Sequence, residues 1–489
     1  MTDVRRLVLV IAAGLAACTV GPDYRKPAVD APASFQYLPA DVKDTANTEW
    51  WKAFGDPVLD ALIDEALANN RNVKVATANV EAAAALFTQA RSSLFPQVGY
   101  GVTAGRQRTS ESGLRPEVAA ALNNPASAYE AALSVSWELD LWGRIRRESE
   151  AARANLLATA EARRGVVLSL VAGVATNYLQ LRGLDGQLEV AKKTLGVYAE
   201  SVKLFELQFR YGQVSQMNVA QARSQYETAA AQIPQIETQI AQTEAALAIL
   251  VGRNPGPIPR GKTIAELTPP AVPSGLPSSL LERRPDLLES EQQLVAANAQ
   301  IGAAKALYYP RITLTGALGF ASPELSDLFK GPSRIWSYAG QLAGPIFSFG
   351  AVSGQVAQAE AAQRAALESY QLAIQNAFAD VDNALVANAK GREQVAAQER
   401  LVAALSDYTR LARLQYNGGY APYSTVLQAE QSLFPAELNL VAYRTAQLNT
   451  SVSLYKSMGG GWVDLAAGNA RLPEDPPAVR EAAPTQPWF

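Results

Sequence analysis

Histidine is absent from this sequence, and cysteine and methionine are nearly so: the 489 residues include one cysteine and three methionines. This shortage excludes histidine-based acid–base catalysis, cysteine–histidine nucleophiles and nearly every metal site built from soft ligands. Aspartate, glutamate, serine and lysine are present, but they form no paired constellation typical of an active site. We therefore expect no enzymatic activity, no cofactor and no bound metal.

An excess of positive charge is also missing. The chain has 43 basic and 46 acidic residues, which gives a net charge of −3 and a pI near 5.5. Proteins that bind nucleic acid over a broad surface need basic patches that neutralise phosphates, so we expect no nucleic-acid partner. Beyond the N-terminus, no uninterrupted apolar run approaches the roughly 18 residues of a transmembrane helix. If the chain crosses a membrane, it does so as strands.

The N-terminus explains the single cysteine. Arg5 and Arg6 precede a short apolar stretch, and small residues stand directly before Cys18. This pattern is typical of a secretory signal peptide over residues 1–17 and is similar to a bacterial lipobox. In lipoproteins, this resemblance implies acylation of Cys18 and stable anchoring in outer-membrane lipid by two or more acyl chains. A buried structural cysteine is the alternative.

The rest of the chain is a tandem duplication. Three pairs of motifs recur in the same order: Phe95-Pro96 and Tyr309-Pro310, Trp142-Gly143 and Phe349-Gly350, Gly212 and Gly419. Gly143 and Gly212 are separated by as many positions as Gly350 and Gly419. Equal spacing in both halves indicates one structural unit used twice.

These patterns predict the organisation of the mature chain. The first repeat covers residues 61–251 and the second covers 285–462. The linker between them, 252–284, is too rich in proline to form a helix. Residues 18–60 form an N-terminal segment acylated at Cys18, and 463–489 form a loose tail.

Each repeat contains two stretches in which apolar residues alternate with small or polar ones. A period of two is typical of a strand with one apolar face. Each stretch is about ten residues long, which is the length that crosses a bilayer at a tilt of about 45°. The apolar positions are Val98, Tyr100, Val102 and Ala104; Ala131, Leu133, Val135, Trp137, Leu139 and Leu141; Ile312, Leu314, Gly316, Leu318 and Phe320; Trp336, Tyr338, Leu342 and Ile346.

Four strands cannot line a hole in a membrane alone. Backbone groups in lipid must all be paired, so the sheet has to close into a barrel, and known barrels begin at about eight strands. Closure therefore requires several copies of the chain, and two, three or four copies satisfy the arithmetic equally. The alternative for any single strand is the edge of a soluble sandwich.

The remaining pattern is helical. Residues 144–211 and 352–416 are rich in strong helix formers and contain no proline, so each predicts one helix about 100 Å long. Return helices at 216–251 and 424–458 follow Gly212 and Gly419, which indicates a tight hairpin at each glycine. In the first long helix, apolar residues at helical spacing predict packing against neighbours: Val167, Leu170, Val171, Val174, Tyr178 and Leu181.

Three motifs resemble a known family, the outer-membrane efflux lipoproteins of the TolC/OprM type, also called the NodT family. They lie at the mature N-terminus, at the start of the second repeat and near the C-terminus: Cys18-Thr19-Val20-Gly21-Pro22-Asp23-Tyr24-Arg25-Lys26-Pro27, Arg283-Arg284-Pro285-Asp286 and Leu454-Tyr455-Lys456-Ser457-Met458-Gly459-Gly460-Gly461-Trp462. The resemblance implies a mainly α fold with a membrane β-barrel portion. A homotrimer would combine four strands per chain into a 12-stranded barrel and extend a long antiparallel α-helical barrel across the periplasm. Residues 18–60 would wrap the equator of this barrel.

The resemblance also implies functional sites. The hairpin tips would dock a periplasmic membrane-fusion adaptor: Tyr211, Gly212, Gln213, Val214, Ser215, Gly418, Gly419, Tyr420 and Tyr423. The pore would narrow near Tyr416, Ser424 and Gln428. Relatives often have aspartate at the position of Gln428 and leucine at that of Ser424, so a carboxylate gate is not expected here. An aromatic constriction at Tyr416 remains, with plain helix packing as its alternative.

Together these implications predict the outer-membrane channel of a tripartite efflux system. The chain would work with the adaptor and an inner-membrane RND-type transporter, and it would carry small molecules out of the cell. Two alternatives stay open: an outlet for type I protein secretion, and a structural lipoprotein that spans the periplasm without conducting.

Overall fold

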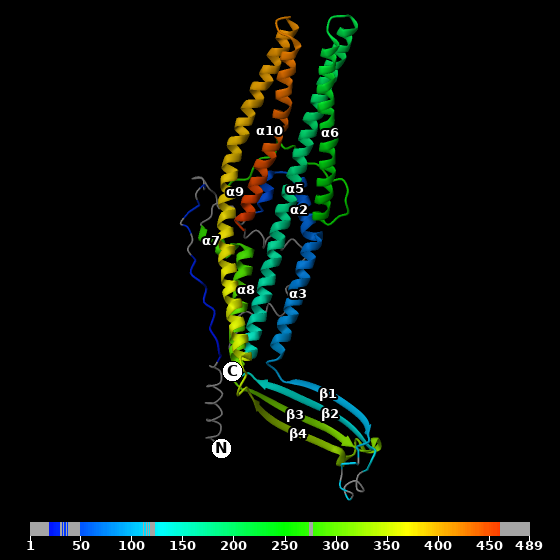
Figure 1. Cartoon of the computed structure of the whole chain (residues 1–489), viewed down its shortest axis with the longest axis vertical. Helices are drawn as coiled ribbons and strands as arrows, with labels where there is room; N and C mark the ends of the chain where they lie inside the picture. Colours follow the sequence, from blue (N-terminus) through cyan, green and yellow to red (C-terminus); the bar gives the residue numbers. More distant parts are fainter. Residues whose placement is uncertain are drawn as a thin grey trace.

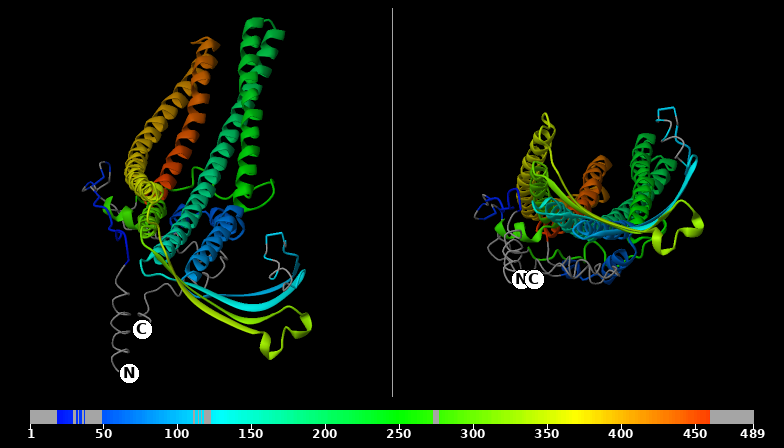
Figure 2. Two further views of the ribbon diagram at one scale, coloured as in Figure 1. Left: turned by 60° about the horizontal axis from the view of Figure 1, so that its bottom comes forward. Right: turned by 90° about the horizontal axis from the view of Figure 1, so that it is seen from below.

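The computed structural model describes residues 19–29, 32, 34–35, 37, 49–110, 112–113, 115, 117, 123–272 and 277–459. The described part is elongated, with two helical hairpins at one end and a sheet at the other (Figure 1). Seen from below, the helices lie along an arc that is open on one side (Figure 2). None of the described helices contains a stretch apolar and long enough to cross a membrane.

The predicted duplication is present in the order of the elements. The first repeat contains α3 (Arg71–Ser92), β1 (Gln97–Gln107), β2 (Ala126–Leu139), α5 (Arg144–Arg210) and α6 (Gln216–Val251). The second contains α8 (Pro285–Ala306), β3 (Arg311–Ser322), β4 (Arg334–Ala343), α9 (Ala351–Asn417) and α10 (Tyr423–Ser457). Helices α3 and α8 both have 22 residues, and α5 and α9 both have 67.

The long helices have the predicted extent to within one residue at each end. At about 1.5 Å per residue, each is about 100 Å long. Gly143 and Gly350 precede them with positive φ angles of 79° and 93°, a conformation that glycine adopts without steric cost. The chain thus turns sharply from strand to helix at the same place in both repeats.

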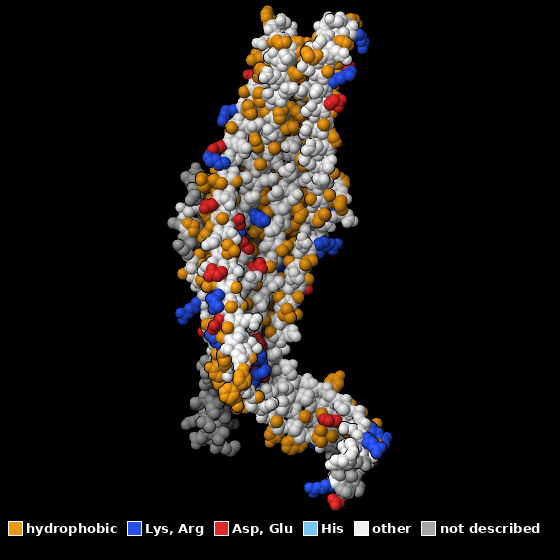
Figure 3. Space-filling model, in the orientation of Figure 1, with side chains coloured by type: hydrophobic (Ala, Val, Ile, Leu, Met, Phe, Trp, Pro, Cys, Tyr) orange, Lys and Arg blue, Asp and Glu red, His pale blue; other side chains and the backbone are white. Residues whose placement is uncertain are grey.

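The four strands form one antiparallel sheet in the order β1-β2-β3-β4. Their registers place the alternating apolar residues of all four strands on one face; for example, Tyr100 pairs with Leu133, Leu133 with Leu318, and Leu318 with Trp336. This face is exposed in the single chain. Apolar side chains accordingly gather on the sheet and at the foot of the long helices (Figure 3). The opposite face carries small and polar residues such as Gly101, Ser134 and Thr315.

The main core surrounds the middle of the long helices. There the predicted stripe of α5 packs against α2 (Pro57–Asn69), the 3-10 helix η1 (Trp50–Phe54) and the ends of α6 and α10. Trp50, Trp51 and Tyr178 are fully buried in this cluster. The packing predicted for α5 is therefore confirmed.

Two details of the sequence-based interpretation were wrong. The proline-rich linker does contain a helix, α7 (Pro277–Arg283), because Pro277 occupies its first position, where a missing N–H costs nothing, and no proline follows inside it. The strands β2 and β4 end at Leu139 and Ala343, so Leu141 and Ile346 lie beyond them. Pro345 lacks the N–H that would continue the ladder of β4.

Candidate functional site

The two hairpin tips farthest from the sheet have the same backbone structure. At the first tip, the N–H of Gly212 donates to the carbonyl of Phe209 at 3.0 Å, and that of Gln213 donates to Gln208 at 2.8 Å. At the second, Gly419 and Tyr420 repeat both bonds, to Tyr416 and Gln415. This pattern is a Schellman motif, which needs a left-handed residue just past the helix. Gly212 and Gly419 supply it with φ of 71° and 77°.

The tips expose one tyrosine each. Tyr211 is 72% exposed and Tyr420 is 88% exposed. Of the other predicted tip residues, Gln213 and Ser215 are exposed, as are Gly212, Gly418 and Gly419, and Val214 is half-buried. A Cβ added to either turn glycine would meet no atom within 4 Å, so the glycines are required by backbone conformation and not by crowding.

Tyr423 differs from the other tip residues because it is buried. Its ring lies 4.0 Å from that of Phe205, measured between centroids, and 5.5 Å from that of Tyr416. Burial raises the pKa of Tyr423 to about 12, and nearby Glu430 adds to the rise. These three rings form the centre of a cluster, here called the tip cluster, that joins the hairpin α5–α6 to the hairpin α9–α10: Phe205, Val219, Ala222, Ala412, Tyr423, Val426, Leu427 and Ala429 are buried in it, and Tyr416 packs against it.

The three residues predicted to narrow the pore lie in two environments. Tyr416 is half-buried against the tip cluster, and its hydroxyl donates to the side chain of Gln208 at 3.4 Å. These contacts are those of helix packing, so the constricting role of Tyr416 stays a prediction. Ser424 and Gln428 are exposed on α10.

Near its tip, each hairpin carries an ion pair across its two helices at equivalent positions, with the charges exchanged. In the first hairpin, Arg223 on α6 pairs with Glu206 on α5 at 2.6 Å, and both side chains are exposed. In the second, Arg413 on α9 pairs with Glu430 on α10 at 2.6 Å, and Glu430 is buried. Alignment of the two repeats could have identified these positions from sequence, but the burial of Glu430 required the structure.

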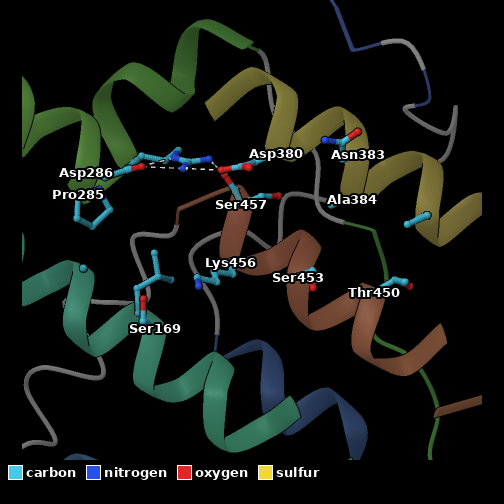
Figure 4. Close-up of a pocket in the computed structure, with 14 residues that line it drawn as sticks. Ser169, Pro285, Asp286, Asp380, Asn383, Ala384, Thr450, Ser453, Lys456 and Ser457 are labelled. Atoms are coloured by element: carbon cyan, nitrogen blue, oxygen red, sulfur yellow. Dashed lines mark hydrogen bonds and ion pairs between the residues drawn. The ribbon is translucent and has the colours of Figure 1, made fainter. Parts of the chain in front are cut away.

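The motif at the start of the second repeat has a structural role. Arg284 is buried, and its guanidinium donates to the carboxylates of Asp286 and Asp380 at 2.7 and 3.0 Å (Figure 4). It also donates to the carbonyl oxygen of Ser457 at 3.1 Å. A Cβ on Gly459 would collide with Arg284, so the motif beginning at Arg283 and the C-terminal glycine motif meet here.

A cavity of about 590 Å³ opens beside this junction, where α5, α9 and α10 approach the start of α8. Polar side chains dominate the labelled part of its wall, including Ser169, Asn383, Thr450, Ser453 and Lys456 (Figure 4). Among the described residues, no group of histidine, cysteine, aspartate and glutamate could hold a metal ion.

The predicted lipid-attachment residue, Cys18, lies outside the described residues, but its neighbour is placed. Thr19 sits at the foot of α5, where an added Cβ on Gly143 would collide with it. The N–H of Val20 donates to the carbonyl of Trp142 at 3.0 Å. The described part of the N-terminal segment therefore begins at the junction between the sheet and the helices.

Comparisons with known proteins agree with this geometry. A family profile described as "Outer membrane efflux protein" matches residues 62–253 and 276–460. The toluene efflux pump outer membrane protein TtgF of Pseudomonas putida is 36% identical over 474 residues, covering 94% of this chain and 98% of that protein. The cation efflux system protein CusC of Escherichia coli is 34% identical over 471 residues, covering 94% and 100%.

Solved structures show the same architecture. The outer membrane channel CmeC of Campylobacter jejuni superposes with a TM-score of 0.85 at 25% sequence identity, covering 93% of this chain and 99% of that one. Long helical hairpins with a small sheet thus recur in solved outer-membrane channels. The predicted TolC-like fold class is confirmed for the single chain.

Proposed function

The chain belongs to the outer membrane efflux protein family, and from this premise we propose that three copies of it form an outer-membrane channel that exports small toxic molecules. The relatives are named for efflux of toluene or cations, which supports small molecules as the cargo class. No relative reported above is named as a protein-secretion outlet, so the efflux role is favoured over that alternative.

The observation that carries the proposal is the incomplete sheet. β1 and β4 are edge strands with unpaired backbone groups, and the in-register apolar face is exposed. In lipid, such edges have to pair, because each unsatisfied backbone group costs several kcal/mol. Pairing β4 of one copy with β1 of the next closes a barrel, and three copies supply twelve strands.

The duplication predicts how neighbouring copies meet. Within one chain, Trp142 at the end of the first strand pair stacks on Tyr309 at 4.7 Å, and its indole N–H donates to the carbonyl of Pro310 at 2.7 Å. The equivalents are Phe349, after β4, and Phe95, before β1. These lie at opposite edges of the sheet, and they are 99% and 56% exposed. We place Phe349 of one copy against Phe95 of the next, because the junction between copies would then resemble the junction between Trp142 and Tyr309 within each chain.

Cross-linking in outer membranes tests this contact. With Phe95→Cys and Phe349→Cys together, a short thiol-reactive cross-linker should give species of two and three chains and nothing larger. The control is Trp142→Cys with Tyr309→Cys, which should link within one chain and leave its mass unchanged. If the first pair gives only single chains, or a ladder beyond three, the proposed assembly is wrong.

The hairpin tips support a docking role at the opposite end. They are the points farthest from the sheet (Figure 1), they share one backbone motif, and each exposes a tyrosine. We propose that a periplasmic adaptor linked to an RND-type inner-membrane transporter binds there through Tyr211 and Tyr420. Tyr423 contributes by holding the two hairpins together, since its ring is buried.

The position of Thr19 supports a lipid anchor at Cys18. If the strands lie in the membrane, the foot of α5 lies at the membrane surface, and an acylated Cys18 next to Thr19 reaches the lipid without further chain. Mass spectrometry of the mature N-terminal peptide tests this: an unmodified Cys18 thiol would rule the anchor out.

Conductance separates a channel from a periplasmic scaffold that has no pore. Purified assemblies in planar bilayers should give discrete current steps when opened, whereas a scaffold gives none. Absence of current from both wild type and variants of the tip cluster, such as Tyr423→Ala, would favour the scaffold.

A further inference from the structure

A second cavity lies between the two hairpins, below the tip cluster. Its volume is about 570 Å³, within the range of small-molecule sites. The wall comes from α5 on one side and from α9 and α10 on the other. A molecule held here would contact both hairpins of one chain.

Glu430 lines this cavity and has an unused acceptor. Its side chain is only 4% exposed, and both contacts from Arg413, by Nε at 3.0 Å and Nη2 at 2.6 Å, fall on Oε1. Oε2 has no hydrogen-bond partner within the described part of the chain and is covered, so a molecule in the cavity reaches it once the carboxylate rotates. A buried carboxylate oxygen without a donor is costly, by about 1–3 kcal/mol or more.

A second unpartnered polar atom lies on the same wall. Thr409 is buried on α9 and lines the cavity, and its Oγ1 likewise has no partner among the described residues. A hydroxyl can donate or accept, whereas a carboxylate only accepts. One group that carries several N–H donors and lies between Thr409 and Glu430 can therefore donate to both oxygens.

The rest of the wall suits an apolar body. Val197, Tyr198, Leu414, Leu433 and Phe434 line the cavity. The remaining charges are balanced, since Arg410 pairs with Asp407 and Lys193 lies near Glu437. Burial raises the pKa of Glu437, and Lys193 opposes part of this rise. The free acceptor of Glu430 is therefore the distinguishing polar feature.

We propose that this cavity is a binding site for amphipathic amines, in which the ammonium group donates to Oε2 of Glu430 and to Oγ1 of Thr409 while the apolar body packs on Leu433 and Phe434. Charge-assisted bonds of this kind are about twice as strong as neutral ones. A neutral alcohol of the same shape binds more weakly, and a carboxylate is rejected by Glu430.

Binding here would tie the two hairpins together. The hydroxyl of Tyr198 on α5 already donates to the backbone carbonyl of Glu430 on α10 at 3.3 Å, so the site coincides with an existing bond between the hairpins. An amine that contacts Tyr198 and Glu430 at once strengthens this connection and favours the arrangement in which the hairpins are close.

Protection of an introduced thiol measures binding on the assembled full-length protein in detergent. Thr194→Cys places a thiol on the cavity wall, and the chain without this substitution gives the background. We expect 1-naphthylmethylamine to slow maleimide labelling at least tenfold at saturation, 1-naphthalenemethanol to act only at higher concentration, and 1-naphthoate to have no effect.

Variants assign the effect to the cavity. Glu430→Gln should raise the amine concentration needed for half-protection at least tenfold, and Ser406→Trp, at the exposed rim, should abolish protection while leaving the pair Arg413–Glu430 intact. The matched control is Glu206→Gln, which removes the exposed carboxylate of the corresponding ion pair in the other hairpin and should change nothing.

Three results would overturn the proposal: no protection by the amine, equal protection by all three compounds, or protection that survives Ser406→Trp. The assay requires no transport, so its failure would leave the channel function untouched. Loss of current or of cross-linked trimers would conversely leave the amine site standing.

Discussion

At the scale of single residues, Asp56 does more than cap a helix. It is fully buried, and its carboxylate accepts bonds from the N–H of Val58 at 2.9 Å, the hydroxyl of Tyr178 at 2.7 Å and the N–H of Lys262 at 3.0 Å. One side chain thus ties the start of α2 to α5 and to the linker between the repeats.

Removal of this carboxylate should loosen the middle of the molecule. Asp56→Ala leaves buried donors without an acceptor, so we expect a loss of about 3 kcal/mol and a lower thermal unfolding midpoint. The exposed Asp64, on the same helix, provides the comparison: Asp64→Ala should leave the midpoint unchanged. Similar midpoints for both variants would show that the three bonds contribute little.

Glu437 makes the stability of the folded protein depend on pH. Burial raises its pKa, with Lys193 opposing the rise. A carboxyl with a higher pKa in the folded state adds stability below its unfolded pKa of about 4.3, and that contribution is lost as the pH rises through the folded-state pKa. Glu437→Gln should therefore melt at a higher temperature than wild type at about pH 7.5, with the difference vanishing near pH 4.

The comparison for this effect is Glu399→Gln, in an exposed pair with Arg444 that joins α9 to α10. It should show no gain at neutral pH. A Glu437→Gln protein no more stable than wild type at pH 7.5 would mean that water or Lys193 compensates the buried charge.

At the scale of elements, the hairpin turns depend on two glycines. A β-branched residue at φ near 77° costs about 1–2 kcal/mol, whereas asparagine tolerates the left-handed region. Gly419→Val should therefore distort the second tip and abolish the drug resistance that wild type restores to a deletion strain, with trimers intact. We expect the same of Gly212→Val.

Gly419→Asn is the matched control and should retain most of the resistance. Full resistance with Gly419→Val would show that the adaptor does not need this turn. Loss of trimers with Gly419→Val would instead assign the turn a role in assembly.

The elements also show what the sequence could predict. Helix α6 begins and ends at the predicted residues, because Gly212 and Gly252 flank an uninterrupted helical pattern. The four strands followed from alternation, and a slip of one residue in their pairing would turn the apolar residues to the other face. The tip cluster did not follow, because the contact of Phe205 with Tyr423 joins hairpins more than 200 positions apart. Nothing local in the sequence marks Glu430 as buried or Tyr416 as packed.

At the scale of the whole molecule, the N-terminal segment runs like a strap along α8. Asp23 pairs with Arg147 at 2.7 Å, and the side-chain amide of Asn298 donates to the carbonyl of Pro22 at 2.9 Å. Gly302 lies beneath this strap: a Cβ there would come within 2.7 Å of the carbonyl oxygen of Val20. Gly302→Val should lift the strap, so that trypsin cleaves after Arg25 at least tenfold faster.

Gly354→Val is the control for the strap, because it makes the same change in a helix where an added Cβ meets nothing within 4 Å. Its cleavage rate should equal that of wild type. Resistance of the Gly302→Val protein to trypsin would show that other contacts hold the segment in place.

The exchanged charges of the two hairpins have a consequence for any ring that these chains build. Around the rim of the ring, the pairs Glu206–Arg223 and Arg413–Glu430 alternate. Adjacent hairpins therefore offer similar but not identical binding surfaces. A partner with one copy per hairpin must therefore bind two kinds of surface. A partner with one copy per chain can select one of the two kinds of surface. A single substitution in one repeat would weaken binding only at every second hairpin of the ring.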